Sequence, residues 1–396
     1  WKQILSAVGN TYQHGLDIDW TAFESSYQRN RVVLPTYPFQ RSRFWMGGGK
    51  SSSISPMKRY KFPMLGERLR LPGSKQVRFE STYTTSSPAY VADHKLFGSV
   101  VVPGASHLAL MLSAANEAFG SSQCKLDDVC FLQPLVPSDD EARNVQLIMD
   151  IKDEGIAYSE LMSIGVDEDP SDPNRWIIHA TGNIHYQVNY DSIDGQLPWE
   201  DIKSEWSPTI TGEKFYSIFT ELGYNLGEAF QWLGDGWYNG SKAVRELRWP
   251  KLPDAVKDYQ LYPSLVDSFF QSLASCQPDG SEEFIFNSGN ADEIYIPFAL
   301  ESFKLYRKPE AGERLWFHST LRDQVNKDHE TQTGDVQLID ENGKIVAEVI
   351  AIETRKANRA ALQQGLNKDV VNDWLYQPRW HTKSNDNTLP EPLNRK

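Results

Sequence analysis

Two strongly apolar segments with helical spacing constrain the fold of this 396-residue chain most. One runs from about residue 105 to 118 and the other from about residue 263 to 275. Their apolar residues recur at the three- and four-residue spacing of one helix face. These residues are Leu108, Leu110, Met111 and Ala115 in the first, and Leu265, Val266, Phe269, Phe270 and Leu273 in the second. Helices this apolar are typical of a protein core, so each is expected to be buried.

Strand-like stretches surround the two helices, between Pro63 and about Lys356. They are Val77–Thr85, Val145–Ile151, Trp176–Tyr186, Leu315–Leu321, Asp335–Ile339 and Lys344–Ile352. The last two flank Asn342-Gly343, a strong hairpin signal. The pattern predicts an α+β fold made of two similar units, each a buried helix wrapped by an antiparallel sheet.

Composition excludes several classes of protein. The formal net charge is −13, whereas a general nucleic-acid binder needs a basic face. No apolar run reaches the roughly 18 residues of a membrane span. The cysteines, Cys124, Cys130 and Cys276, are too few and too irregularly spaced for a disulfide framework or a zinc site, which favours a reducing, cytoplasmic location. Because the chain lacks an initiator Met, we expect a piece of a longer protein.

Both ends have the character of linkers. Leu34–Trp45 contains two prolines among aromatic residues and is expected to be extended along another surface. Gly47–Ser53 predicts a flexible boundary. Beyond Lys356 the chain becomes polar, and Trp374–Trp380 is expected to start a further element.

One candidate site surrounds His94. Gly98 follows in a loop, and Pro103-Gly104 opens the first apolar helix. Proline suits a helix start, and glycine lets a ligand approach the backbone. The N–H groups there can hold a carbonyl oxygen that gains negative charge, while His94 removes a proton nearby. The alternative is that His94 is an ordinary loop histidine.

The second candidate is Asp267, which lies among the apolar residues of the second helix. Burial would raise its pKa and let it act as an acid. Gln271, one helical turn later, can hydrogen-bond to the carboxyl group. The alternative is that Asp267 faces solvent. Together, His94 and Asp267 would supply a base and an acid from matched halves.

Other polar residues carry weaker signals. His107 is interpreted as packed or solvent-facing, and His179 as structural. The acidic runs Asp139–Glu141 and Asp167–Asp172 are interpreted as loops. The chain has no phosphate-binding Gly-Lys loop, dinucleotide fingerprint or nucleophile elbow, so no bound cofactor is predicted.

The two candidate segments resemble the dehydratase domains of modular type I polyketide synthases. His94, Gly98 and Pro103 match the family pattern HxxxGxxxxP, and Asp267 and Gln271 match DxxxQ/H. The resemblance implies a double hotdog fold, at residues 58–356, with hotdog units at about 58–195 and 205–356. It also implies a post-acyltransferase linker at 1–48 and a post-dehydratase linker at 357–396.

The resemblance further implies the reaction. A 3-hydroxyacyl thioester on the phosphopantetheine arm of an acyl carrier protein loses water and becomes a trans-2-enoyl thioester. His94 takes the C2 proton, Asp267 protonates the leaving hydroxyl, Gln271 orients Asp267, and the Gly104 N–H binds the thioester carbonyl. No metal or cofactor of the domain's own is implied.

Two departures from the family pattern stand out. The usual YGPxF stretch is Leu226-Gly227-Glu228-Ala229-Phe230 here, so a tyrosine hydroxyl is missing, and Tyr224 is a possible substitute. Tyr262 stands where a histidine is common. These departures leave two alternatives to an active dehydratase. One is a non-catalytic, dimerising scaffold, and the other is a double-bond isomerase or ring-forming enzyme of the same fold.

The implied partners are an acyl carrier protein, the neighbouring acyltransferase and downstream synthase domains, and a second copy in a homodimer. Since carrier proteins are acidic, docking needs a local basic patch. Arg68, Arg70, Lys75 and Arg78 form one candidate, and a solvated strand edge is the alternative.

Overall fold

The structure is a computed structural model that describes residues 1–26, 62–137, 142–153, 155–188, 190, 206–208, 210–276, 293–322 and 331–359. The chain divides into two compact units, Trp1–Lys58 and Arg59–Lys396. The tracts Leu34–Trp45, Gly47–Ser53, Asp139–Glu141 and Trp374–Trp380 lie outside the described residues. The linker and domain boundaries inferred from the sequence therefore stay predictions.

The smaller unit contains two helices that the sequence analysis did not predict. These are α1 (Lys2–Gln13) and α2 (Trp20–Glu24). Asp19 begins α2, because its side chain accepts a hydrogen bond from the backbone N–H of Ala22 at 2.9 Å. Trp20 packs edge-on against Tyr12, with ring centroids 5.3 Å apart.

The larger unit is built on one antiparallel sheet. Its thirteen described strands follow the order β1-β2-β6-β7-β8-β5-β13-β16-β15-β14-β12-β11-β9. The strands of the first half are β1 (Glu67–Leu69), β2 (Val77–Tyr83), β5 (Cys124–Phe131), β6 (Arg143–Asp153), β7 (Ile156–Gly165) and β8 (Ile177–His185). Those of the second half are β9 (Ser207–Pro208), β11 (Leu233–Asn239), β12 (Lys242–Leu247), β13 (Glu293–Leu305), β14 (Leu315–Leu321), β15 (Thr331–Asp340) and β16 (Ile345–Asn358).

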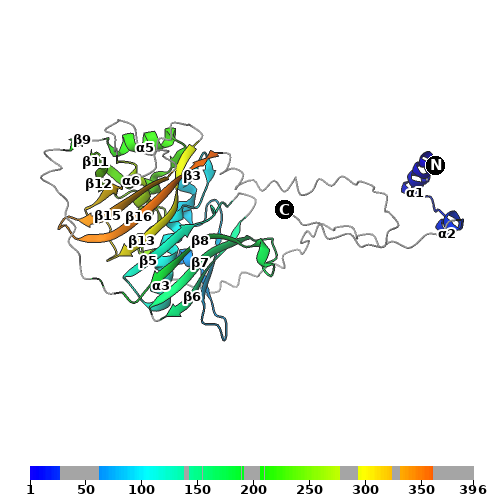
Figure 1. Cartoon of the computed structure of the whole chain (residues 1–396), viewed down its shortest axis with the longest axis horizontal. Helices are drawn as coiled ribbons and strands as arrows, with labels where there is room; N and C mark the ends of the chain where they lie inside the picture. The colour runs from blue at the N-terminus through cyan, green and yellow to red at the C-terminus, as the bar shows by residue number, and fades with distance from the viewer. Residues whose placement is uncertain are drawn as a thin grey trace. The chain divides into compact units, whose positions relative to one another are not determined.

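The two halves of the sheet join where β5 pairs with β13, and Leu300 lies opposite Val129. Figure 1 shows the cyan strand β5 of the first half running beside the yellow strand β13 of the second. All six predicted strand stretches are confirmed, although β16 continues beyond its predicted end to Asn358. The predicted hairpin is also confirmed, and Gly343 adopts φ 77° in its turn.

Each half of the sheet packs on one buried helix, as predicted. Helix α3 (Gly104–Phe119) contacts β5 and β8, and α6 (Pro263–Leu273) contacts β12, β14 and β15. The two helices also pack on each other. Every residue of α6 is buried, as is the run from Ala105 to Asn116 in α3. Each helix is therefore apolar all round because it contacts the sheet on one side and the neighbouring helix on a second side.

A small second sheet lies outside this arrangement, in the order β10-β3-β4. It consists of β3 (His94–Leu96), β4 (Ser99–Val100) and β10 (Tyr224–Leu226). The remaining elements are α5 (Gly212–Glu221) and the 3₁₀ turns η1 (Pro63–Leu65), η2 (Ala89–Asp93), η3 (Pro173–Arg175), η4 (Glu228–Phe230) and η5 (Val256–Asp258). Because β10 belongs to the second half and β3 to the first, this sheet brings residues of both halves to His94.

Candidate active site

His94 is held by its own hairpin. It begins β3, which turns back into β4 through Phe97 and Gly98, both at positive φ (48° and 84°). The turn returns the chain so that the His94 Nδ1 atom lies 2.7 Å from the carbonyl oxygen of Val101. A carbonyl only accepts hydrogen bonds, so Nδ1 carries the proton and the neutral ring keeps its lone pair on Nε2.

The spacing of the HxxxGxxxxP motif follows from this hairpin. Position 98 requires glycine because a residue with a side chain is strained at φ 84°. Lack of space is not the reason, since an added Cβ would meet no atom within 4 Å. Gly98 does not line the cavity described below. Its backbone N–H donates to Asn225 Oδ1 at 3.1 Å, which ties the His94 hairpin to β10.

Pro103 and Gly104 bring the start of α3 to the site. Pro103, at φ −65°, directly precedes the helix, which begins at Gly104. Both residues line the cavity. An added Cβ on Gly104 would lie 3.1 Å from ring atoms of Phe131, so glycine keeps the helix end open. The first N–H groups of a helix have no partner within the helix, which makes this end suited to a developing negative charge.

Asp267 comes from the middle of α6 and is 7% exposed. Its Oδ2 atom accepts a hydrogen bond from Gln271 Nε2 at 2.8 Å, one turn later. Gln271 is held in turn by the hydroxyl of Tyr216, which donates to its Oε1 atom at 2.9 Å. The predicted relationship between Asp267 and Gln271 is therefore present, and Asp267 does not face solvent.

Burial shapes the ionisation of both residues. Burial lowers the pKa of His94 from its ordinary value, although the nearby Asp267 carboxylate opposes this change. Burial raises the pKa of Asp267, against the opposing effects of His94 and the Gln271 hydrogen bond. Desolvation thus favours a neutral imidazole and a protonated carboxyl group, one able to accept a proton and the other able to donate one.

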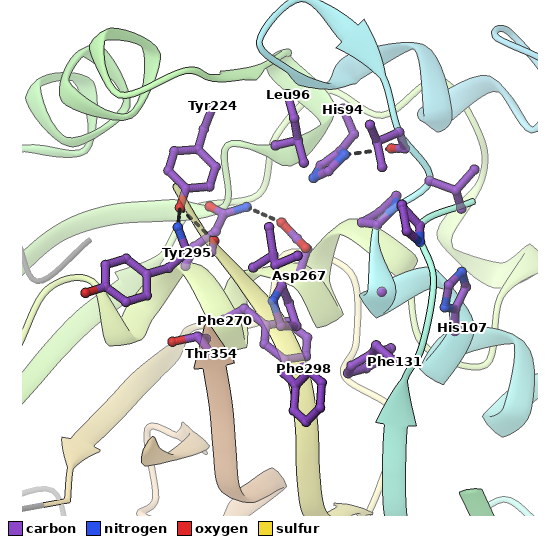
Figure 2. A pocket seen from close by; sticks show the side chains of 18 of the residues that line it. His94, Leu96, His107, Phe131, Tyr224, Asp267, Phe270, Tyr295, Phe298 and Thr354 are labelled. Atoms are coloured by element: carbon purple, nitrogen blue, oxygen red, sulfur yellow. Dashed lines mark hydrogen bonds between the residues drawn. The ribbon is translucent and has the colours of Figure 1, made fainter. Parts of the chain in front are cut away.

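One cavity of about 210 Å³ joins these groups. Figure 2 shows His94 and Asp267 reaching into it from two different parts of the chain. Its wall is mainly apolar and includes Leu96, Val101, Val102, Phe131, Phe219, Leu226, Phe270, Ile296, Pro297 and Phe298. An apolar chamber with a few polar groups suits a hydrocarbon chain whose one polar end reacts.

Tyr224 and Leu226 both face this cavity, because they are alternate residues of β10. Leu226 lies directly opposite His94 in the pairing of β10 with β3. The Tyr224 hydroxyl is engaged by the backbone of Tyr295, since it donates to the carbonyl at 2.7 Å and accepts from the N–H at 2.8 Å. Tyr224 therefore links β10 to β13 through two hydrogen bonds.

Tyr262 does not line the cavity. It is fully buried just before α6, and its ring packs edge-on against Tyr259 with centroids 4.7 Å apart. The position where the family often has a histidine is thus part of an aromatic cluster in this protein.

Several cavity residues were not anticipated from the sequence. His107 is packed, as one of the two interpretations held, but it also lines the cavity. So does Thr354 of β16. The helical spacing of Gly104 and His107, three residues apart, would have placed them on one face of α3. His179 has the expected structural role, bonded to Gln133 and Ser163.

The described residues show neither a metal-binding cluster nor a membrane-spanning helix. In the described ranges, no group of three or more His, Cys, Asp or Glu side chains is arranged to hold a metal ion. All three cysteines are unpaired. Within the same ranges, none of the helices has the length and apolar character required to cross a membrane.

Comparisons with known proteins agree with this geometry. A family model described as "Polyketide synthase dehydratase domain" matches residues 62–163, and one described as "Polyketide synthase dehydratase N-terminal domain" matches residues 194–364. Polyketide synthase GfsE of Streptomyces halstedii is 26% identical over 381 residues, which is 95% of this chain and 9% of that protein. Polyketide synthase PksN of Bacillus subtilis is 23% identical over 356 residues, or 86% of this chain and 6% of that protein.

Solved structures show the same relationship. An inactive mutant of the CurJ dehydratase, crystallised in complex with a compound, is 30% identical with a TM-score of 0.67. The match covers 77% of this chain and 99% of that one. The dehydratase domain from the CurF module of curacin polyketide synthase is 28% identical, with a TM-score of 0.64 over 75% of this chain and all of that domain.

The fold and the paired motifs thus define a polyketide synthase domain of the dehydratase type. The chain belongs to the family of polyketide synthase dehydratase domains, and the predicted double hotdog fold is confirmed.

Proposed function

We propose that this domain removes water from a 3-hydroxyacyl thioester, carried on the phosphopantetheine arm of an acyl carrier protein, and releases a trans-2-enoyl thioester. One observation carries the proposal. A buried histidine and a buried aspartate, each oriented by its own hydrogen bond, share an apolar cavity, and desolvation favours the neutral form of both.

In this proposal His94 is the base. Its Nε2 lone pair takes the proton from C2 of the thioester. The negative charge that develops on the thioester oxygen is stabilised by the N–H of Gly104 at the start of α3. Pro103 and Gly98 contribute by setting the helix start and the hairpin that aims His94.

Asp267 is the acid. Its Oδ2 atom accepts the Gln271 hydrogen bond, so the proton is assigned to Oδ1. Asp267 gives this proton to the C3 hydroxyl, which leaves as water while the C2–C3 double bond forms. The proton on His94 then returns to Asp267, so both groups recover their starting states and no cofactor of the domain is needed.

A related domain supports the proposed importance of His94. The CurJ dehydratase, 30% identical, becomes an inactive mutant when one histidine is replaced by phenylalanine. That domain was also crystallised with a compound bound. Both facts agree with a family in which histidine and a ligand cavity are central.

The proposed partners are the acyl carrier protein, the adjoining synthase domains and a second copy of the domain, in the cytoplasm. For carrier docking we propose the basic cluster at β1 and the turn after it. Arg68, Arg70 and Lys75 are exposed, whereas Arg78 is half-buried and donates to Gln76. Exposed cations on an otherwise acidic chain (net charge −13) can attract an acidic partner.

The apolar Leu226 opposite His94 keeps a second function open, that of a non-catalytic scaffold. In an active enzyme with this arrangement, Asp267 alone must protonate the leaving group. The same base and acid could also move a double bond or close an oxygen ring, without a mass change of their own.

The test is to load 3-hydroxyacyl chains of several lengths and both hydroxyl configurations onto a carrier protein and to follow the intact mass. Loss of one water, with NMR of the product showing a trans-2 double bond, supports the proposal. An unchanged mass for every chain, from a domain that remains folded, contradicts it and favours the scaffold. An NMR spectrum showing a shifted double bond would identify an isomerase, and one showing an oxygen ring would identify a ring-forming enzyme.

A further inference from the structure

Two polar side chains in the cavity have no role in the reaction described above. His107, on the first turn of α3, is 2% exposed, and neither of its ring nitrogens has a hydrogen-bond partner among the described residues. Thr354, on β16, is 1% exposed, and within the described part of the chain its hydroxyl is equally without a partner. Both residues line the cavity.

These two side chains differ from the buried polar side chains that take part in the proposed reaction. His94 and Asp267 each have an orienting hydrogen bond, and Gln271 bonds to both Asp267 and Tyr216. A buried polar group without a hydrogen bond costs free energy, and native proteins rarely keep one without a function. An apolar residue at either position would avoid that cost if the chamber held only hydrocarbon.

The ring of His107 has two aromatic neighbours, one of them a second imidazole. Its ring lies 6.1 Å from that of Phe131 and 6.2 Å from that of His179, measured between centroids. Burial and the neighbouring His179 lower the pKa of His107 to about 3, so the ring is neutral near pH 7. A neutral imidazole has one donor and one acceptor nitrogen, so it can pair with a hydroxyl or a carbonyl oxygen.

The positions of the two residues set where such oxygens would be. His107 follows Gly104 by three residues, about 4.5 Å along the same face of α3. Figure 2 shows Thr354 on the opposite flank of the pocket, beyond Phe270 and Phe298. An acyl chain whose thioester carbonyl lies at Gly104 would thus meet polar atoms on two sides, away from its reacting carbons.

We propose that the acyl chain bound here carries oxygen substituents, hydroxyl or carbonyl, beyond C3, and that His107 and Thr354 each recognise one of them by a hydrogen bond. This inference rests on the proposed function and narrows its substrate class to oxygenated chains. A chain without such an oxygen leaves the two buried groups unpaired, which is the usual basis for rejecting an analogue that lacks a polar group.

The test uses carrier-bound 3-hydroxyacyl chains of one length that differ only beyond C3. One is a plain hydrocarbon, and the others bear a hydroxyl or a carbonyl at C5 or at C7. We expect kcat/KM for at least one oxygenated chain to exceed that for the plain chain by about tenfold or more. Equal values for all chains, or a preference for the plain chain, would overturn the inference.

Variants assign the preference to the two residues. His107→Phe and Thr354→Val replace each polar group by an apolar group of similar size. We expect each to reduce the ratio of kcat/KM for the oxygenated chain that the replaced residue recognises to that for the plain chain by about fivefold to tenfold. His318→Phe is the matched control, since His318 also has a buried nitrogen without a partner among the described residues but does not line the cavity. An unchanged ratio in both cavity variants, or an equal change in the control, would contradict the roles of His107 and Thr354.

A binding measurement separates this inference from the proposed function. Pantetheine amides of the same acyl chains, which do not need to react, are titrated into the domain by calorimetry. Tighter binding of an oxygenated chain, lost in His107→Phe or in Thr354→Val, supports the inference even if no water is lost from any substrate. Equal binding of plain and oxygenated chains overturns it, whether or not dehydration occurs.

Discussion

Gln271 donates a hydrogen bond from its Nε2 atom to the Oδ2 atom of Asp267, at 2.8 Å, across one turn of α6. The amide is fixed at its other end by the Tyr216 hydroxyl, at 2.9 Å. Because both Gln271 and Asp267 are buried, the carboxyl group has little freedom to rotate. Gln271 is therefore a positioning residue, and its effect on the acid can be tested separately from that of the acid itself.

Replacing Gln271 by leucine should remove this orientation with little change in volume. The hydrogen bond favours the charged form of Asp267, so its loss should raise the pKa of the acid further. We expect kcat to fall about tenfold and the alkaline limb of the pH–rate profile to move to higher pH. Gln271→His, which keeps a donor, should restore part of the rate. A lower rate with an unmoved alkaline limb, and no rescue by histidine, would contradict the positioning role.

The pH dependence of the wild-type reaction follows from the two buried groups. The base must be neutral, so the rate should fall on the acid side as His94 gains a proton. The acid must be protonated, so the rate should fall on the alkaline side as Asp267 loses one. Since burial lowers the first pKa and raises the second, we expect a bell-shaped profile of kcat/KM. A profile that rises steadily with pH would show that no protonated acid is required.

Tyr224 should contribute to stability through β13. Tyr224→Phe removes both hydrogen bonds between the hydroxyl and the backbone of Tyr295. We expect the free energy of unfolding to fall by about 1–3 kcal/mol, because these are buried bonds. Thermal and urea unfolding of the variant measure this. An unchanged stability with a large loss of kcat would instead assign Tyr224 to the chemistry, as a substitute for the hydroxyl that Leu226 lacks.

His107 should make the fold sensitive to acid. Its pKa falls from 6.5 in the unfolded chain to about 3 in the folded one, so below pH 6.5 the unfolded chain binds the extra proton. The stability linked to neutral His107 is therefore fully present above pH 6.5, the pKa in the unfolded chain. It is lost as the pH falls towards 3, the pKa in the folded chain. We expect wild-type Tm to fall more than that of His107→Phe between pH 7 and pH 5. Parallel acid profiles for the two proteins would contradict burial of a neutral His107.

Much of the fold could be predicted because its decisive patterns are local. The burial of α3 and α6 follows from apolar residues within each helix, and the β15–β16 turn follows from Asn342-Gly343. The joining of β5 to β13 could not be predicted, since strand pairing depends on contacts between distant segments. Helices α1 and α2 were not predicted, because the strongest pattern near this end of the sequence is the aromatic and proline-rich tract Leu34–Trp45, which follows both helices.

The candidate site residues named from the sequence that line the cavity are His94, Asp267, Gln271, Pro103, Gly104, Tyr224 and Leu226, whereas most of its apolar wall was not predicted. His94 and Asp267 stand out because a His before a turn glycine and a lone Asp in an apolar helix break the local pattern. The pairing of β10 with β3, which places Leu226 opposite His94, involves strands of only three residues and carries no such signal. Close packing beside the two strands favours this pairing instead. Gly227, next to β10, lies so near Asp93, next to β3, that an added Cβ would be 2.4 Å from Asp93 Cγ. Phe131 and Thr354 likewise reach the cavity through tertiary structure.

The central claim is that His94 and Asp267 act as base and acid in one dehydration. The most direct measurement compares wild type, His94→Ala and Asp267→Asn on a carrier-bound 3-hydroxyacyl chain, by intact mass over time. The account predicts loss of one water with wild type and a rate at least about 10²-fold lower in each variant, since acid–base groups contribute about 10²–10⁴-fold each. Far-UV circular dichroism controls for folding of the variants. Water loss at the wild-type rate in either folded variant would contradict the account.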